Sequence, residues 1–295
     1  MRPTVIGIGE ILWDLFPSGP RFGGAPANFA CHAAALGAEA FVVGRVGDDD
    51  LGRAAIAALR DLGVGTGHVA VDADRPTGTV AVETDASGKA RYEFAADAAW
   101  DRMRWSDDLA ALAARADAVC FGTLGQRDAR SRETIRRFVR STRPDCLRVF
   151  DVNLRKPFFD DAAIRESLDL ANVLKLSDDE LPVVAAAFAE SGSEAEIMSS
   201  LAGRFRLRAV ALTRGERGAA LLCDGHLYEC PGRTVAVKDT VGAGDAFAAA
   251  LTTGLLRRDD PETVLRRAVE IGAFVCTRPG ATPALPDDLR EPFLR

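Results

Sequence analysis

The chain has 295 residues, 47% hydrophobic and 27% charged, a balance typical of a globular protein rather than a disordered or fibrous one. Its 37 basic and 43 acidic residues give a net charge of −6, and no local run of Lys or Arg offsets it, which argues against nucleic acid as a partner. No apolar stretch reaches the ~18 residues of a membrane span, no signal peptide is recognisable, and the six cysteines are scattered. We therefore expect a cytoplasmic protein that does not contact membranes.

Short β-branched runs alternate with longer Ala/Leu-rich runs, which predicts an α/β fold with a mostly parallel sheet and helices on both faces. Strands are expected at 5–8, 41–46, 118–121, 148–152, 173–176, 209–213 and 219–222. Helices are expected at 26–36, 51–62, 130–141, 164–170, 178–188, 194–205, 243–255 and 261–277. No break in composition divides the chain, so residues 1–295 are expected to form a single domain.

The segment 77–94 breaks this pattern, because it alternates at period two on both sides of the turn-forming residues 85–88. It predicts a β-hairpin, which is either a solvent-exposed edge ribbon or a lid over a ligand cleft. One face of the hairpin is apolar and must be covered, and a second copy of the chain would suit that role. The residues of this face are Val80, Val82, Tyr92 and Phe94.

Near the amino end, two glycines precede a helix that begins at a proline, in the run Gly23-Gly24-Ala25-Pro26-Ala27-Asn28. Asn28 would lie on the first turn of this helix and face a cleft. Asp14 follows the first strand and can accept paired hydrogen bonds from the vicinal hydroxyls of a sugar. The alternative for Asp14 is an ordinary turn aspartate.

Polar residues also follow two central strands, at 151–155 and at 175–180. Because ligands bind at the carboxyl ends of the strands in open α/β sheets, these residues are site candidates. Glu180 suits a magnesium ligand that acts through water, since magnesium keeps much of its hydration. The alternative for Glu180 is a solvated glutamate in the first turn of a helix.

The strongest motif is the glycine-rich run at 239–247, Asp-Thr-Val-Gly-Ala-Gly-Asp-Ala-Phe, which leads into a helix of small residues. The backbone amides of Gly242, Ala243 and Gly244 are expected to point together and hold an anion. The positive end of the helix would keep Asp245 ionised, so that its carboxylate can accept a proton from a hydroxyl attacking phosphorus. The alternative is that Asp245 only caps the helix. The Rossmann and Walker fingerprints are absent.

In their order and spacing, these motifs resemble the ribokinase-type carbohydrate kinases, and within them the fructokinase branch. The resemblance covers nearly the whole chain and rests on 9–14, 23–28, 44–49, 151–155, 175–180, 213–218 and 239–247. It implies a ribokinase-like three-layer sandwich with a small β-hairpin lid at about 72–100, which in this family is commonly a dimerisation element. It also implies ATP-dependent phosphorylation of a primary hydroxyl of a small sugar.

The resemblance further implies a role for each site residue. Asp245 would be the base, and the amides from Gly242 onward the anion hole. The sugar would be held by Asp14, Gly24 and Asn28, with Arg91, Asn153 and Arg155 as further candidates. The nucleotide would contact Lys175, Thr213, Gly215 and Gly218. Glu180 would order water on Mg²⁺, and K⁺ would bind near Asp239, Val241 and the 277–280 loop. Ser177 stands where the family usually has Asn, which can rearrange the water around magnesium.

Fructokinase is the favoured activity, but other acceptors stay open. A 2-keto-3-deoxygluconate kinase needs a cationic clamp for the substrate carboxylate, for which only Arg91 and Arg155 are candidates. A nucleoside kinase needs an aromatic sandwich, and only 7% of the residues are aromatic. A non-catalytic sugar-binding regulator on the same fold is the alternative of another class, and the intact motif around Asp245 argues against it.

Overall fold

The structure is a computed structural model of the chain. Residues 1, 85–89 and 295, together with the side chains of 82–84 and 90–92, lie outside its described part. The turn expected at 85–88 and the side chains of Val82, Arg91 and Tyr92 therefore lie outside the described residues. Within that part, no helix combines the length and the apolar run that crossing a bilayer requires.

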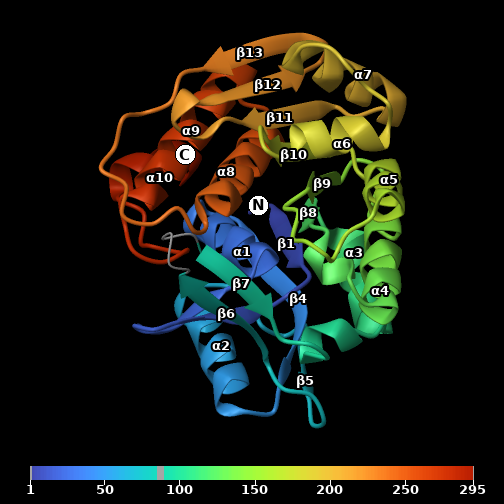
Figure 1. Cartoon of the computed structure of the whole chain (residues 1–295), viewed down its shortest axis with the longest axis vertical. Coiled ribbons are helices and arrows are strands. Elements are labelled where there is room, and N and C mark those ends of the chain that lie inside the picture. The colour runs from blue at the N-terminus through green and yellow to red at the C-terminus, as the bar shows by residue number, and fades with distance from the viewer. Residues whose placement is uncertain (1, 85–89, 295) are drawn as a thin grey trace.

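A nine-stranded sheet runs through the molecule in the order β13-β12-β11-β10-β9-β8-β1-β4-β5 (Figure 1). Neighbouring strands pair in parallel except where β12 pairs with β11 and β13. The mostly parallel sheet that the sequence predicts is thus confirmed. The strands are β1 Thr4–Ile8, β4 Glu39–Gly47, β5 Val69–Asp72, β8 Ala118–Phe121, β9 Leu147–Asp151, β10 Val173–Ser177, β11 Ala209–Thr213, β12 Ala219–Cys223 and β13 His226–Cys230.

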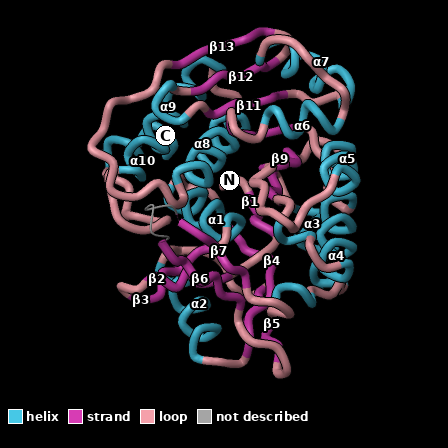
Figure 2. Tube along the Cα trace, viewed as in Figure 1, coloured by secondary structure: helices cyan, strands magenta, loops and turns pink. Residues whose placement is uncertain are grey.

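Helices cover both faces of this sheet, because successive side chains of its central strands point to opposite faces and both faces are apolar (Figure 2). One layer is formed by α3 Asp107–Arg115, α4 Ala129–Arg140, α5 Asp161–Leu170, α6 Leu181–Ala187 and α7 Glu194–Phe205. The other is formed by α1 Ala25–Ala35, α8 Ala243–Arg257, α9 Pro261–Cys276 and α10 Asp287–Leu294. Helix α2, Asp50–Asp61, packs beside β4.

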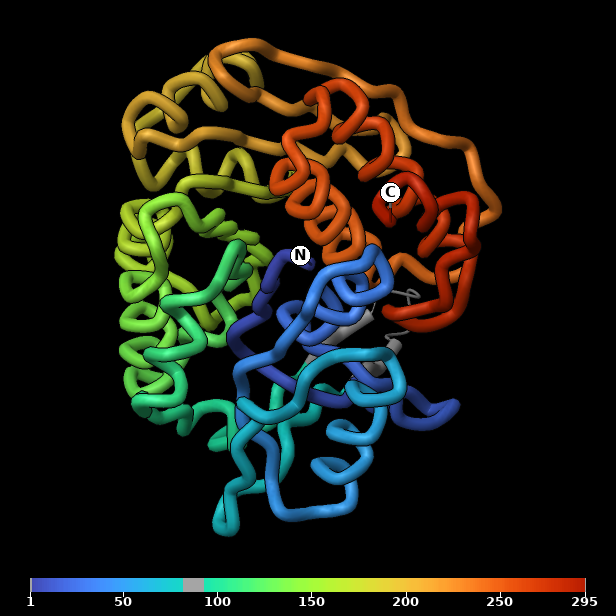
Figure 3. Tube along the Cα trace, turned by 180° about the vertical axis from the view of Figure 1, so that it is seen from behind, coloured from blue at the N-terminus to red at the C-terminus, as the bar shows by residue number. Residues whose placement is uncertain are grey.

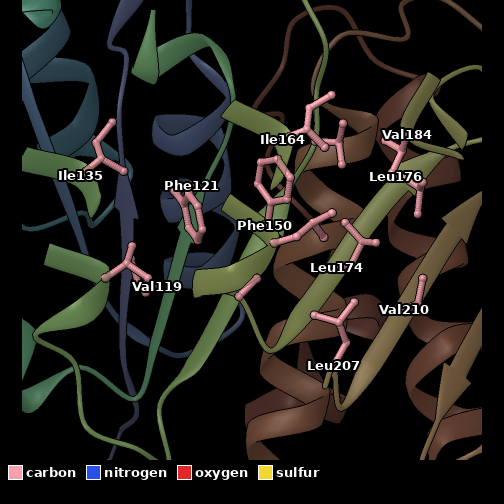
Figure 4. Close-up of a cluster of buried hydrophobic side chains, with 14 of the residues drawn as sticks. Val119, Phe121, Ile135, Phe150, Ile164, Leu174, Leu176, Val184, Leu207 and Val210 are labelled. Atoms are coloured by element: carbon pink, nitrogen blue, oxygen red, sulfur yellow. The ribbon is translucent and has the colours of Figure 1, made fainter. Parts of the chain in front are cut away.

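The first helical layer rests on large side chains of the sheet. Val119 and Phe121 in β8 point to this side with Phe150 of β9, and the rings of Phe121 and Phe150 stack at 5.4 Å (Figure 4). Ala118 and Cys120, between and beside them, belong to the core on the opposite face. The sheet is therefore held between two apolar layers, which fixes the carboxyl ends of its strands relative to α1 and α8.

A second sheet of four strands, β3-β2-β6-β7, contains the hairpin that the sequence predicts at 77–94. Its strands are β2 Leu12–Phe16, β3 Gly19–Gly23, β6 Gly78–Thr84 and β7 Ala90–Phe94. Strands β2 and β3 are not expected from the sequence, so the lid is larger than the predicted hairpin.

The chain itself covers part of the hairpin's apolar face. Val80 is buried in a cluster with Leu12, Trp100 and Leu124, and the ring of Phe94 meets that of Phe158 edge to face at 5.4 Å. The expectation that the face is covered thus holds for Val80 and Phe94, and the cover there is the chain itself rather than a second copy. A homodimer formed through the lid stays a prediction, because the described residues of one chain do not test it.

Candidate active site

The candidate residues gather where β1, β9, β10 and β11 end and where α1 and α8 begin. Helices α1 and α8 lie side by side, as the front and back views both show (Figures 1 and 3). Asn28, on the first turn of α1, donates from Nδ2 to Oδ2 of Asp245, on the first turn of α8, at 2.8 Å. Two segments 217 residues apart thus meet in one buried contact.

Asp245 does not cap its helix. The N-cap of α8 is Gly242, with φ +80°, and no side chain makes a cap hydrogen bond there. Asp245 is 9% exposed, and its burial raises the pKa of its carboxyl, against the lowering effects of the Asn28 hydrogen bond and of Lys175. The cap interpretation is therefore wrong. Burial thus works against the ionised carboxylate that the sequence predicts at Asp245, while Asn28 and Lys175 favour it.

The turn before α8 leaves backbone amides unpaired. Within the described part of the chain, the amides of Gly244 and Asp245 have no backbone partner, whereas the amide of Ala243 donates to the Thr240 carbonyl at 3.3 Å. The Gly244 and Asp245 amides are therefore free to take the part expected of an anion cradle, whereas the Ala243 amide already has an acceptor. Only glycine fits at Gly242, since a Cβ there would lie 2.3 Å from the carbonyl oxygen of Ala281.

A buried ion pair lies beneath this turn. Nζ of Lys175, in β10, is 2.9 Å from Oδ1 of Asp151, in β9, and both side chains are almost fully buried. A Cβ on Gly244 would lie 3.0 Å from the same Nζ. Burial lowers the pKa of the Lys175 ammonium, but the surrounding carboxylates outweigh burial and raise it, so the group stays charged. A fixed positive charge thus lies directly behind the cradle.

On the sugar side, Asp14 lies within β2, where it is opposite Arg21 of β3, so the interpretation as a turn aspartate is wrong. Burial raises the pKa of Asp14 to about 6, while Arg155 opposes the rise. The exposed guanidinium group of Arg155 also lowers the pKa of Asp245 and of Glu10 through its positive charge. The structure therefore brings Asp14, Arg155 and Asp245 around one site.

Gly24 lies at the N-cap of α1 with φ +108°, and a Cβ there would be 2.4 Å from the carbonyl oxygen of Glu10. This close approach explains why the position needs glycine. Asn153 follows β9 with φ +40°, and its carbonyl accepts from the Thr123 hydroxyl at 3.2 Å. The backbone of Arg91 pairs with Glu83 in the hairpin. The Arg91 side chain is outside the described residues, so its role as a sugar-binding candidate stays a prediction.

The residues expected to line the nucleotide site lie at the β11–β12 connection. Thr213 ends β11, and its carbonyl accepts from the Asp178 amide at 2.9 Å. Gly215, with φ +56°, has open space around it. Gly218 differs, because a Cβ there would lie 2.0 Å from the carbonyl oxygen of Cys230. This close packing and a φ of +97° account for glycine at 218 without a nucleotide contact.

Glu180 bridges the ends of β9 and β10. Its Oε1 accepts from the Leu154 amide and its Oε2 from the Ser177 amide, both at 2.8 Å. Each oxygen keeps a lone pair that can accept from a metal-bound water, so the side chain fits the outer-sphere role. No group of three or more His, Cys, Asp or Glu side chains in the described part of the chain could hold a metal ion directly.

Asp239 lies close to the 277–280 loop, as expected. Its Oδ2 accepts from the Gly280 amide at 3.0 Å and its Oδ1 from the Val241 amide at 3.1 Å. Arg21 of β3 also pairs with Oδ2, at 2.8 Å. The Asp239 carboxylate thus accepts from three donors, one of which is a cation, so this side chain is not available as a K⁺ ligand. K⁺ binding by backbone carbonyls here stays a prediction.

Two buried residues of the site were not selected from the sequence. Burial raises the pKa of Glu10, which directly follows the β1 turn, to about 7, and its Oε2 has no hydrogen-bond partner among the described residues. His32 lies one helical turn after Asn28, and its Nε2 is 2.9 Å from the carbonyl oxygen of Ala281. The spacing of four between Asn28 and His32 is the signal that could have indicated a shared face.

The chain is similar to known proteins along most of its length. The model of the family described as pfkB family carbohydrate kinase matches residues 19–288. The chain belongs to this family. A fructokinase of Klebsiella pneumoniae is 33% identical over 313 aligned positions that cover 99% of each chain. A fructokinase of Salmonella typhimurium is also 33% identical, over 99% of this chain and 100% of its own.

Solved structures of the family agree in fold. The fructokinase of Xylella fastidiosa with bound ATP superposes with a TM-score of 0.86 at 25% identity, covering 97% of this chain and 96% of its own. A 2-dehydro-3-deoxygluconokinase of Thermotoga maritima has a TM-score of 0.87 at 21% identity, covering 99% of both chains, and therefore shows the fold alone. The expectations of a ribokinase-like fold and of a carbohydrate kinase are confirmed.

Proposed function

We propose that this kinase transfers the γ-phosphoryl group of ATP to a primary hydroxyl of D-fructose. The observation that carries the proposal is the buried Asp245, held at 2.8 Å by Asn28 beside unpaired amides at the start of α8. A proton acceptor and an anion cradle on one turn of helix are what an alcohol needs to attack a phosphorus atom.

In the proposed reaction the sugar hydroxyl gives its proton to the Asp245 carboxylate as its oxygen bonds to the γ-phosphorus. The bond from that phosphorus to the bridging oxygen breaks, and ADP leaves. A raised pKa makes Asp245 a better proton acceptor than an exposed aspartate, provided that it is ionised before the sugar arrives. Asn28, whose amide group holds one carboxylate oxygen, leaves the other free for the hydroxyl.

The charge that develops on the transferred group would be met by the amides of Gly244 and Asp245 and by Lys175, whose Nζ lies behind Gly244. Thr213 and Gly215 would line the nucleotide. Mg²⁺, when it is bound with ATP, supplies further positive charge to the phosphates, and Glu180 would hold its water. Because Lys175 is already paired with Asp151, we assign it to long-range stabilisation rather than to direct contact.

The sugar would lie between the start of α1 and the lid sheet, with Asp14, Gly24, Asn28, Asn153 and Arg155 around it and Arg91 as a further candidate. Fructose as the acceptor is supported by the named relatives, among them a Vibrio cholerae fructokinase solved with fructose, ADP and calcium, 25% identical with a TM-score of 0.82. A ketodeoxygluconate acceptor, which needs a cationic clamp for its carboxylate, is the alternative that the substrate series below tests.

An ADP-release assay over fructose, ribose, tagatose, ketodeoxygluconate and adenosine tests the proposal. We expect the highest kcat/KM with fructose, and we expect turnover to depend on ATP and Mg²⁺. The same series with and without K⁺ tests whether K⁺ is needed for activity. Turnover of ketodeoxygluconate above that of fructose would overturn the substrate assignment. No ATP consumption with any acceptor would favour the non-catalytic sugar-binding regulator.

A further inference from the structure

Two adjoining cavities lie at the amino ends of the central strands, at the opposite edge of the sheet from the candidate active site. Their volumes are about 430 Å³ and about 570 Å³. They share four lining residues, Leu147, Arg208, Leu255 and Arg258. Leu147 begins β9, Arg208 directly precedes β11, and the other two lie at the carboxyl end of α8. The shared wall joins the two cavities into one groove.

The groove exposes positive charge that the chain leaves unpaired. The guanidinium groups of Arg208 and Arg258, exposed to solvent, pair with no carboxylate in the described part of the chain. The same holds for Arg2, which lines the larger cavity. Three free guanidinium groups around one groove are unexpected in a chain whose net charge is −6.

Most acidic residues of the groove are already engaged. In the larger cavity, Asp117 and Asp145 both accept from Arg143, at 2.7 and 3.2 Å. In the smaller one, Asp259 pairs with Arg267 at 2.7 Å. Asp260 caps α9 by accepting from the Thr263 amide at 2.9 Å, which leaves Asp224 as the remaining acid. The five aspartates and four arginines of the lining thus nearly cancel, and the positive charge that no described carboxylate meets lies at the guanidinium groups of Arg2, Arg208 and Arg258.

The groove also offers apolar contact. The half-buried side chains of Leu255 and Leu256 supply this contact. Leu147, Val173 and Ala209 also line the groove, but at most 3% exposed they add little surface and serve as a fixed floor. A small inorganic anion would leave such a floor unused, whereas an anion with a carbon body would cover it.

We propose that the groove binds a phosphate monoester, with the phosphate between Arg208 and Arg258 and the carbon body over the apolar floor. A guanidinium group donates two parallel hydrogen bonds to phosphate oxygens, so two of them suit a dianionic terminal phosphate. The cavity volumes lie within the range of about 300–1,000 Å³ typical of small-molecule sites. Sugar phosphates and mononucleotides share this chemistry.

The position of the groove gives such binding a route to the active site. Helix α8 carries Asp245 on its first turn and ends at Arg257, next to Arg258, over a length of about 22 Å. Strand β11 likewise runs from Ala209, next to Arg208, to Thr213. A ligand that clamps Arg208 to Arg258 holds the far ends of the two elements that carry the proposed base and nucleotide residues. The groove is therefore a regulatory site.

Titration calorimetry on the full chain tests the proposal. The active site is saturated with Mg-ADP and fructose, and fructose phosphate, AMP and inorganic phosphate are titrated separately as probes. We expect one ester to bind, and Arg208→Ala and Arg258→Ala each to weaken it at least 10-fold. The control is Arg206→Ala, which removes an exposed arginine that lines neither cavity, and it should bind as the unchanged protein does.

Equal weakening in Arg206→Ala, no loss in the other two variants, or inorganic phosphate binding as tightly as both esters would overturn the proposal. The three variants should keep the basal kcat, because none touches the catalytic residues. The bound ester should change kcat or KM of the unchanged protein and of Arg206→Ala, but not of Arg208→Ala or Arg258→Ala. Binding without any kinetic effect would overturn the regulatory role. The readout is binding at the groove, so loss of the fructokinase assignment leaves the proposal standing.

Discussion

Around Asp245, single contacts decide the protonation and position of the reacting groups. Burial raises the pKa of its carboxyl, and the Asn28 hydrogen bond lowers it. The ring of His32, one turn further along α1, approaches the Ala281 carbonyl, the same atom that excludes any side chain at Gly242. Each of these contacts makes a separate prediction for a single substitution.

Asn28→Ala should raise the pKa of Asp245 further, because it removes a hydrogen bond to the charged form. Since the base must be ionised, the acidic limb of the kcat/KM profile should move to higher pH by about one unit. A pH series on the variant and the unchanged enzyme measures this shift. An acidic limb that stays in place would show that Asp245 is not the group that titrates there.

His32→Leu should destabilise the fold by about 1–3 kcal/mol, because the buried Ala281 carbonyl loses its donor. Burial lowers the pKa of His32, so the ring is neutral at physiological pH and donates through one nitrogen. His32→Gln, whose amide nitrogen reaches nearly as far as Nε2, should recover most of the loss. Urea unfolding measures the free energy of unfolding of both variants. Equal stability of the two would contradict the role of the hydrogen bond.

At the scale of elements, the Lys175–Asp151 pair ties β9 to β10 beneath the anion cradle. Breaking a buried pair leaves an uncompensated charge, so Lys175→Met should cost about 3–5 kcal/mol of unfolding free energy. Arg53→Met is the control, since it removes an exposed arginine paired with Asp48 and should change stability little. A loss for Lys175→Met no larger than for the control would contradict the role of the pair.

The strongly periodic elements could be predicted from the sequence, and those shaped by their surroundings could not. The seven predicted strands and the Gly242–Asp245 turn are present, because their local pattern is sufficient. Strand β13 was missed because it is mostly exposed and carries no apolar alternation. Helix α6 begins at Leu181 rather than 178, since the Glu180 side chain turns back to the Ser177 amide. Glu10 enters the site only through tertiary contact with α1.

For the whole molecule, the cost of burying Glu10 should appear as a pH dependence of stability. Its pKa rises from 4.5 to about 7 on folding, so the folded state binds more protons between these values. This contribution therefore lowers stability as pH rises through that window. Glu10→Gln should remove the cost, giving a gain of up to about 3 kcal/mol at pH 8 and almost none at pH 4.5.

Thermal unfolding of the Glu10→Gln variant from pH 4.5 to 8 measures this dependence. A gain that is the same at every pH would contradict the assignment, because it would come from packing rather than from charge. The Glu196→Gln variant is a control of opposite sign, because the Ser193 hydrogen bonds lower the pKa of the exposed Glu196, so its removal should cost stability as pH rises. We also still predict that residues 1–295 fold as one domain, so each variant should unfold in a single transition.

The central claim is that Asp245 accepts the proton of a sugar hydroxyl, and single-turnover phosphoryl transfer from ATP to fructose by Asp245→Asn tests it most directly. The amide keeps the shape and the contact with Asn28 but cannot accept the proton, so transfer should slow by about 10²–10⁴-fold. Fructose and ATP affinities, measured by calorimetry on the same variant, should change little. Near-normal transfer by a correctly folded variant would contradict the account.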